Sequence, residues 1–201
     1  MSASGNCYKV RLGLSRLGQD YHYYDVDSLN GETRSSAFLA INPFGQIPAL
    51  KLEDGQVLLQ SNAILQYLCR DTELWPDEAL AQQEVLAWLF WEQYSHEPKI
   101  AVARSWVKRG DDQRDPAGFE TLKQGGAVAL SYMEASLIKQ DYLAVHGISI
   151  ADIALYAYTH SIADIGFDAS HYPGISAWLK RIEAQNWFVS LDQTPERKRL
   201  S

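Results

Sequence analysis

The spacing of apolar residues changes near residue 71, and this change limits the folds that the chain can adopt. Before it, signals for short helices and strands alternate in the order helix, strand, helix, strand, strand, helix. After it, apolar residues recur almost only at helical spacing. The stretch DTELWPDE at 71–78 is polar, contains a proline and is expected to be the linker. The sequence therefore predicts α/β plus all-α architecture, with an N-terminal α/β domain over 1–72 and a helical C-terminal domain over 79–201.

Local signals place the elements of the first half. The expected elements are a helix capped by Asn6 and ended by Gly18, a strand over 21–27, a short helix over 34–41, strands over 48–52 and 56–59, and a helix capped by Ser61. Asp54 and Gly55 lie between the last two strands, and Asp-Gly favours a tight hairpin turn.

The second half is expected to contain several helices. They span residues 79–109 with a kink at Pro98, residues 116–137 after Asp115, a helix after Ser149, and a last helix starting at Tyr172-Pro173-Gly174. Ser149 and Asp152 form a capping box, and the apolar residues that follow indicate a helix buried on all sides. The basic tail ERKRL at 196–200 is expected to be a solvated end.

Composition excludes several classes of function. A net charge of −7 and a pI near 5.2 argue against nucleic acid or an anionic membrane as the main partner. No apolar run approaches the roughly 18 residues that would span a bilayer, and the first residues have no apolar signal core. The two cysteines, Cys7 and Cys69, are too few for a disulfide scaffold or a tetrahedral zinc site. We therefore expect a cytoplasmic protein with reduced thiols and no metal.

The stretch NPFGQIPAL at 42–50 contains an unusual strand start. Gly45 supplies backbone freedom, whereas Pro48 removes a hydrogen-bond donor where a strand is expected to begin. The sequence therefore indicates that the backbone at Ile47 serves something other than the sheet.

Three motifs together resemble a known family. The stretch NPFGQIPAL, a hairpin and then QSNAI at 60–64 resemble the glutathione-binding half of cytosolic glutathione S-transferases. The capping box followed by ALYAY at 154–158 looks like the capped core helix of that family. The stretch SGNCYKVRL at 4–12 resembles the first helix of its serine-using theta-like and bacterial, nu-like members.

The resemblance covers nearly the whole chain and implies a fold and an activity. It implies a thioredoxin-like N-terminal domain, an all-helical C-terminal domain and a homodimer. Glutathione would be the co-substrate, and its thiolate would attack a small hydrophobic electrophile.

The resemblance also assigns glutathione-binding residues. Gln46, Ile47 and Pro48 match the family's proline loop, in which a cis peptide turns the backbone groups before the proline toward the cysteinyl part of glutathione. Gln60 and Ser61 match the start of a helix that receives the γ-glutamyl carboxylate, a placement that suits the helix dipole. The family often has Glu where this chain has Gln60.

Two further parts of glutathione need partners. Arg34 is the nearest candidate for the glycyl carboxylate, ahead of Lys51. A free thiol has a pKa of about 8.5, so a donor aimed at the sulfur is needed to stabilise the thiolate at neutral pH. Ser4 aligns with the family serine, and Asn6 lies where some bacterial members use an asparagine amide.

Other side chains carry weaker expectations. Cys7 matches a cysteine that forms mixed disulfides with glutathione in one branch, but a buried inert thiol fits the sequence equally well. Tyr94, Arg104 and Trp106 on the long kinked helix are expected to line the electrophile pocket. His96 and Glu97 are neighbours on that helix and do not face each other, so we expect a structural or pocket-lining role for them.

One departure from the family pattern concerns the start of the chain. Family members have a central strand before the serine, whereas only Met1, Ser2 and Ala3 precede Ser4 here. Either the native start lies upstream or this strand is missing. In the second case the strand at 21–27 has to find another partner, and Ser4 lies on a frayed terminus.

Two alternatives to the transferase remain open from sequence. One is glutathione-dependent disulfide reduction, favoured if Asn6 or Cys7 handles the sulfur. The other is a binding protein that kept the fold and lost catalysis. The sequence does not identify the electrophile, because scattered helical side chains would form its pocket.

Overall fold

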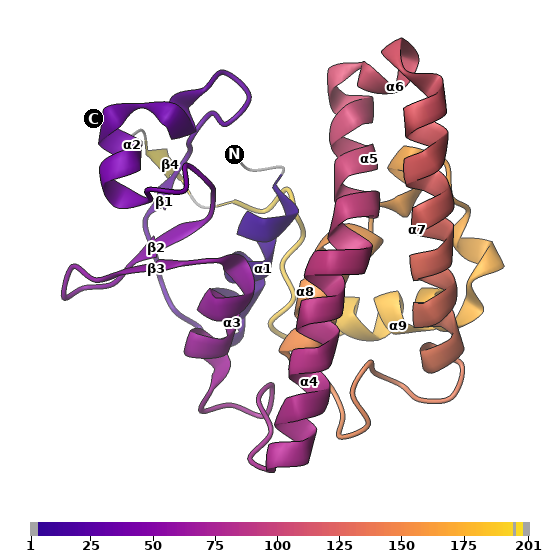
Figure 1. Ribbon diagram of the computed structural model, residues 1–201. Coiled ribbons are helices and arrows are strands. Elements are labelled where there is room, and N and C mark those ends of the chain that lie inside the picture. Colours follow the sequence, from indigo (N-terminus) through magenta and orange to yellow (C-terminus); the bar gives the residue numbers. More distant parts are fainter. Residues whose placement is uncertain (1–3, 195, 199–201) are drawn as a thin grey trace. The chain divides into compact units, whose positions relative to one another are not determined.

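The polypeptide folds as two units, one of which is built from both ends of the chain. The computed structural model describes residues 4–194 and 196–198 (Figure 1). The first unit contains the residues up to Asp71 together with those from Asn186 onward, and the second unit runs from Thr72 to Gln185. The last part of the range 79–201, expected in the helical domain, therefore belongs to the first unit.

The first unit combines short strands with helices, as predicted. Its elements are α1 (Gly5–Arg16), β1 (Tyr23–Tyr24), η1 (Glu32–Arg34), α2 (Ser36–Ile41), β2 (Ala49–Lys51), β3 (Val57–Leu59), α3 (Ser61–Cys69) and β4 (Arg197–Lys198). Strands β2 and β3 pair antiparallel with Ala49 opposite Leu59, and Gly55 in the turn has a φ of 89°. The predicted hairpin is confirmed.

Helices α1 and α3 lie against each other and form the core of this unit (Figure 1). Val10, Leu14 and Ile64 are buried at their contact. Gly13 allows the close approach, because a Cβ at this position would lie 2.9 Å from Leu65 Cδ2. With a larger residue here, either the Leu65 side chain or the helices would have to shift.

Strand β1 is shorter than the predicted strand over 21–27, and its partner is the C-terminal segment. Tyr23 and Tyr24 pair parallel with Arg197 and Lys198. The chain then turns at Asp27, whose Oδ1 accepts hydrogen bonds from the backbone N–H groups of the next turn. The expectation of a solvated tail is wrong for 197–198, because a strand edge satisfies their backbone groups. The sequence left open whether the family's strand before Ser4 is missing. Residues 1–3, which would bear on this, lie outside the described residues.

Buried polar groups of α1 hold the C-terminal segment. The Arg11 guanidinium donates to the backbone carbonyls of Ser190, Leu191 and Gln193 at 3.1, 2.9 and 2.6 Å. The Tyr8 hydroxyl donates to the carbonyl of Val189 at 2.6 Å. A buried guanidinium needs such acceptors, since a charge left without them is costly to desolvate.

The second unit is helical, as predicted. Its elements are α4 (Ala79–Trp91), η2 (Glu92–His96), α5 (Glu97–Arg109), α6 (Asp111–Arg114), α7 (Pro116–Leu137), α8 (Ile150–Thr159), η3 (Ile162–Ile165), η4 (Ala169–His171) and α9 (Pro173–Glu183). Helix α7 starts as expected: Asp115 caps it by accepting from the Gly118 N–H at 2.9 Å, and Pro116 occupies its first position.

The predicted interruption of the long helix takes the form of a π-helical segment. Segment η2 separates α4 from α5 and immediately precedes the turn that contains Pro98. Proline has no N–H for the normal helical bond, and a wider turn adapts the helix to this loss. His96 is buried within the segment, and its Nε2 lies 3.0 Å from Thr159 Oγ1. This contact supports the structural role expected for His96.

Helix α8 is buried over its whole length, and the predicted capping box at its start is present. Asp152 accepts hydrogen bonds from the Ser149 N–H, the Leu143 N–H and Trp178 Nε1 at 2.8, 2.9 and 2.8 Å. Burial raises the pKa of Asp152 from its ordinary value of 3.8 to about 6, although these hydrogen bonds act to lower it. The carboxyl group thus joins α8 to α9 and to the preceding loop.

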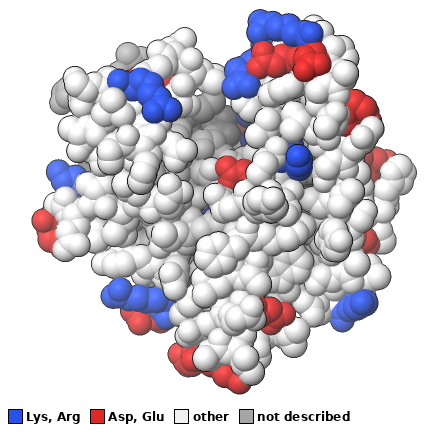
Figure 2. All heavy atoms as spheres, in the orientation of Figure 1, with Lys and Arg blue, Asp and Glu red and all other residues white. Residues whose placement is uncertain are grey.

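Charged side chains of both signs are scattered over the face seen in Figure 2. One mixed group surrounds α6, where Asp111 accepts from Arg109 Nε at 2.7 Å and from Arg114 Nη1 at 2.8 Å. Within the described residues, we find no helix that is long and apolar enough to cross a membrane, and no group of three or more potential metal ligands.

The pKa of Asp152 predicts a specific pH dependence of stability. The folded state binds the Asp152 proton more tightly than the unfolded state, so this contribution is full below about pH 4 and is lost as the pH rises through about 6. Between pH 4 and 7, the unfolding free energy of the parent should fall relative to Asp152→Asn by on the order of 1–3 kcal/mol. Chemical denaturation at several pH values measures this difference.

Ser149→Ala is the matched control for that experiment. It should lower the unfolding free energy by roughly 0.5–2 kcal/mol through loss of the cap. It retains the titrating carboxyl group, so the pH dependence should persist. A parent and an Asp152→Asn variant with parallel pH profiles would contradict the prediction.

Candidate functional site

The N-terminus of α3 has the features of an anion-binding site. The helix begins at Ser61, and the preceding residue, Gln60, has a φ of 67° and a ψ of 112°. The side chain of Gln60, the N-cap residue, makes no cap hydrogen bond to this helix, and the N-terminal end of a helix dipole favours an anionic ligand. Ser61 is the first helical residue, so its prediction as N-cap is wrong. Gln60, whose φ is positive, takes the N-cap position instead.

The side chain of Ser61 points toward α1. Its hydroxyl donates to Asn6 Oδ1 at 2.9 Å, and only 6% of its surface is exposed. The next residue makes a second link between these helices, because Lys9 Nζ donates to Asn62 Oδ1 at 3.2 Å. Ser61 and Asn6 were predicted to serve different parts of one ligand, and the structure brings them together.

A loop of residues 42–48 lies between α2 and β2, and the predicted cis peptide bond at Ile47-Pro48 is confirmed. Buried Asn42 organises this loop: its Oδ1 accepts from the Phe44 N–H at 3.0 Å, and its Nδ2 donates to the Gln46 carbonyl at 2.6 Å. This role of Asn42 was not predicted from the sequence. Its position directly before a proline, where an asparagine side chain often replaces backbone bonds, was the available signal.

Two glutamines connect this loop to α3. Gln60 Nε2 donates to Gln46 Oε1 at 3.4 Å, and both side chains are exposed. The loop that carries Ile47 and the start of α3 are therefore neighbours, as the predicted binding residues require.

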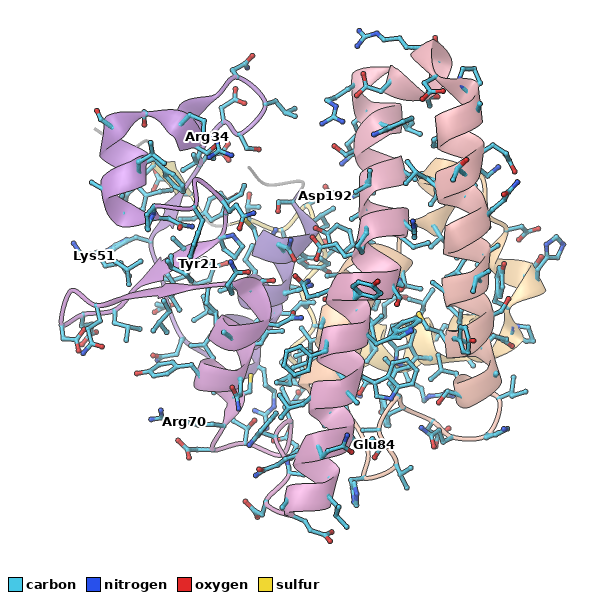
Figure 3. All side chains as sticks on the ribbon, in the orientation of Figure 1. Tyr21, Arg34, Lys51, Arg70, Glu84 and Asp192 are labelled. Atoms are coloured by element: carbon cyan, nitrogen blue, oxygen red, sulfur yellow. The ribbon has the colours of Figure 1, made fainter. Side chains whose placement is uncertain are left out.

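Arg34 lies against the same loop. Its Nη1 donates to the carbonyl of Phe44 at 3.3 Å, and a Cβ on Gly45 would lie 2.6 Å from that Nη1 atom. Gly45 also has a φ of 61°, so both its backbone and its surroundings favour glycine. In Figure 3, Lys51 projects outward from β2, away from Arg34. Of these two predicted candidates, Arg34 is the one that contacts the loop.

The start of α1 differs from the prediction in its cap. Ser4, not Asn6, is the N-cap, and its Oγ accepts from the Cys7 N–H at 3.3 Å. Asn6 is the second helical residue, which frees its side chain from the capping role and places it opposite Ser61. Burial raises the pKa of the Cys7 thiol, although the hydrogen bond with Ser4 acts to lower it. Cys69 is fully buried.

The residues predicted for the electrophile lie in different surroundings of the second unit. Tyr94 on η2 is 86% exposed. Arg104 on α5 is buried, and its Nε pairs with Asp164 Oδ2 at 2.8 Å. Trp106 packs toward α7, where a Cβ on Gly118 would lie 3.0 Å from its ring. The contacts of Arg104 and Trp106 thus go to different elements, η3 and α7.

Comparison with known proteins agrees with this architecture. Two family descriptions match: "Glutathione S-transferase, N-terminal domain" over residues 3–71 and "Glutathione S-transferase, C-terminal domain" over residues 89–186. Glutathione S-transferase 3 of Zea mays is 31% identical over 199 residues, which cover 94% of this chain and 89% of the relative.

Solved structures agree as well. The crystal structure of a glutathione S-transferase from Pseudomonas fluorescens is 46% identical, with a TM-score of 0.92 and 96% coverage of both chains. The structure of Ure2p in complex with S-hexylglutathione is 25% identical, with a TM-score of 0.82 and 92% coverage of both chains. The fold is thus a thioredoxin-like domain followed by a helical domain. The chain belongs to the glutathione S-transferase family.

The strained backbone of Gln60 should lower the stability of the protein, whereas its side chain is expected to contribute to glutathione binding. A non-glycine residue at this φ is strained by roughly 1–3 kcal/mol, and glycine adopts it freely. Gln60→Gly should therefore have a higher unfolding free energy than Gln60→Ala by about 1 kcal/mol, measured by chemical denaturation.

The alanine variant is the control, because both variants lack the same side chain. Isothermal titration with glutathione should show similarly weakened binding in both. Greater stability of Gln60→Ala than of Gln60→Gly would show that this backbone is not strained.

Proposed function

We propose that this protein is a glutathione transferase that conjugates glutathione to a small hydrophobic electrophile. The observation that carries the proposal is the meeting of three elements in the first unit. The start of α3, the Ile47-Pro48 loop and the start of α1 are joined by the Gln46–Gln60 and Asn6–Ser61 hydrogen bonds. The complex of Ure2p with S-hexylglutathione supports glutathione as the co-substrate.

Glutathione would bind across these three elements. The N-terminus of α3 would receive the γ-glutamyl carboxylate, since its N–H groups and dipole favour an anion. Gln46 and Gln60 would contact the same end of the peptide. The backbone of Ile47, before Pro48, would bind the cysteinyl part like an added strand. Arg34 would pair with the glycyl carboxylate.

The start of α1 would then stabilise the sulfur, as in the serine-using members of the family. The Ser4 oxygen accepts from the Cys7 N–H, and the Ser4 hydroxyl also makes a side-chain hydrogen bond with the Cys7 thiol. In the complex, the hydroxyl would donate its one proton to the glutathione thiolate instead. The Asn6 amide would supply a second donor. The thiol proton leaves to solvent, the thiolate forms a carbon–sulfur bond with the electrophile, and the leaving group departs with its electron pair.

Disulfide reduction through Cys7 is less well supported. Burial raises the pKa of Cys7, which lowers its thiolate fraction and hence its reactivity. The third possibility, a binding protein without turnover, predicts retention on immobilised glutathione and no conjugation.

The second unit would supply the electrophile contacts and the dimer interface. Tyr94, Arg104 and Trp106 remain the proposed electrophile residues, and the ring of Tyr94 is the most exposed of the three. Phe90, Val128 and Tyr132 on α4 and α7 are exposed apolar residues, and the rings of Trp91 and Tyr132 lie 6.4 Å apart. Exposed apolar surface of this kind supports the proposed homodimer. We also retain the proposed cytoplasmic location.

Conjugation of glutathione to a chlorinated dinitrobenzene tests the function directly. We expect turnover with this electrophile and little reduction of a model disulfide. A hydrogen bond to a charged group contributes roughly 1.5–3 kcal/mol, so Ser4→Ala should raise the pKa of the bound thiol by about one to two units. Thiolate absorbance against pH measures this shift.

Ser36→Ala is the matched control, because Ser36 is exposed on α2. It should leave both turnover and thiol pKa unchanged. Reduction of the disulfide without conjugation would favour the reductase, and an unchanged pKa in Ser4→Ala would remove Ser4 from the mechanism.

The assignment of Arg34 predicts a preference for a free glycyl carboxylate. An exposed ion pair contributes up to about 1 kcal/mol, so the parent should bind glutathione roughly threefold to fivefold more tightly than its glycyl ethyl ester. Arg34→Gln should remove this preference in isothermal titration. Lys51→Gln is the control and should retain it; the reverse result would move the role to Lys51.

A further inference from the structure

The turn between β1 and η1 contains an exposed Asn-Gly pair. Of the asparagines in the sequence, only Asn30 precedes a glycine. Both residues of the pair are exposed, and Gly31 has a φ of 82°. A Cβ added at Gly31 would lie in open space, so water reaches this peptide bond freely.

An asparagine that precedes glycine can lose its side-chain amide. The backbone nitrogen of the glycine attacks Cγ of the asparagine and gives up its proton, and the amide nitrogen leaves as ammonia. Glycine favours this step because it has no Cβ to crowd the nitrogen. Water then opens the resulting succinimide ring at either carbonyl and leaves aspartate or isoaspartate. The net reaction consumes one water and turns a neutral amide into a carboxylate.

Asp27 holds the Asn30 amide in the folded turn. Asp27 Oδ2 accepts from Asn30 Nδ2 at 2.7 Å, and Asp27 Oδ1 accepts from the backbone N–H of the same residue at 3.1 Å. The side-chain hydrogen bond is the main cause that holds the pKa of Asp27 below its ordinary value. Ring closure brings Asn30 Cγ to the nitrogen of Gly31, so the side chain has to turn away from Asp27. The strength of this contact therefore sets the rate of cyclisation.

A carboxylate at residue 30 does not fit this turn. The donor Nδ2 is replaced by an oxygen that faces Asp27 Oδ2, and two ionised carboxylates at hydrogen-bonding distance repel each other. Glu32 adds a further negative charge, since its Oε2 accepts from the Asp27 N–H at 2.6 Å. The modified turn should therefore open.

The same turn leads into the segment that carries Arg34. The Glu32 N–H donates to the Asp27 carbonyl at 2.9 Å, and the Arg34 N–H donates to the Gly31 carbonyl at 2.8 Å. The Arg34 guanidinium contacts the Phe44 carbonyl at 3.3 Å. Opening of the turn thus frees the backbone that places this guanidinium against the loop.

We infer that Asn30 is a site of spontaneous deamidation that Asp27 restrains, and that the product carboxylate opens the turn and releases Arg34. The site depends only on the chemistry of the turn and goes beyond the proposed function. Its effect on glutathione rests on that function, because Arg34 is assigned there to the glycyl carboxylate.

Peptide mass spectrometry of protein incubated at mildly alkaline pH tests the site. The parent should convert Asn30 to aspartate and isoaspartate, whereas exposed Asn186, which precedes Trp187, should keep its amide. Asp27→Ala should convert several-fold faster than the parent, and Asp27→Asn, which keeps a neutral acceptor, should lie between them. Gly31→Ala should convert several-fold more slowly.

Hydrogen exchange and isothermal titration measure the consequence. Asn30→Asp should reproduce the incubated protein at once, with faster exchange of the Arg34 N–H. Its preference for glutathione over the glycyl ethyl ester should fall from roughly threefold to fivefold toward onefold. Asn30→Gln is the matched control, because its longer amide cyclises far more slowly and still reaches Asp27. It should keep both the slow exchange and the preference.

Several results would overturn the inference. Equal conversion of Asn30 and Asn186 would reject the site, and equal rates in the parent and Asp27→Ala would reject the restraint. Unchanged exchange of the Arg34 N–H in Asn30→Asp would reject the coupling to Arg34. A parent that binds no glutathione would overturn the proposed function alone, since mass and exchange need no ligand and still decide the inference.

Discussion

The contact between α1 and α3 is the constraint on which the first unit depends. Gly13 allows the two helices to approach closely, and Val10, Leu14 and Ile64 fill their interface. Polar groups at the N-terminal ends of the same helices then come within hydrogen-bonding distance. The packing of apolar residues therefore fixes the positions of these polar groups. Groups on packed helices are held more precisely than groups on flexible loops.

The proposed site combines rigid and strained parts of this frame. Helix ends supply oriented N–H groups, and buried Asn42 holds the loop that leads to Ile47. Gln60 has a positive φ, a backbone conformation that residues other than glycine rarely adopt. Strain of this kind persists only where neighbouring structure enforces it, and it is typical of ligand-binding positions.

Much of the fold was predictable from local signals, whereas several details of the site were not. The hairpin and the starts of α7 and α8 each depend on residues close in sequence, and the structure confirms them. The residues are Asp54-Gly55, Asp115-Pro116 and the Ser149–Asp152 box. The caps of α1 and α3 were each misplaced, because Ser4, Asn6 and Ser61 are all good capping residues. Only contacts between distant helices decide their roles. The pairing of β1 with β4 joins opposite ends of the chain and had no local signal.

The second unit is inserted in the sequence of the first, and this affects the order in which the two units can fold. Arg11 is synthesised early, but the carbonyls that it binds belong to residues 190–193. Residues up to 193 must therefore leave the ribosome before α1 acquires these partners, although domains generally fold from the N-terminus onward. The helical unit can be complete while the first unit still awaits the segment from Asn186 onward, so the first unit is the later of the two to mature.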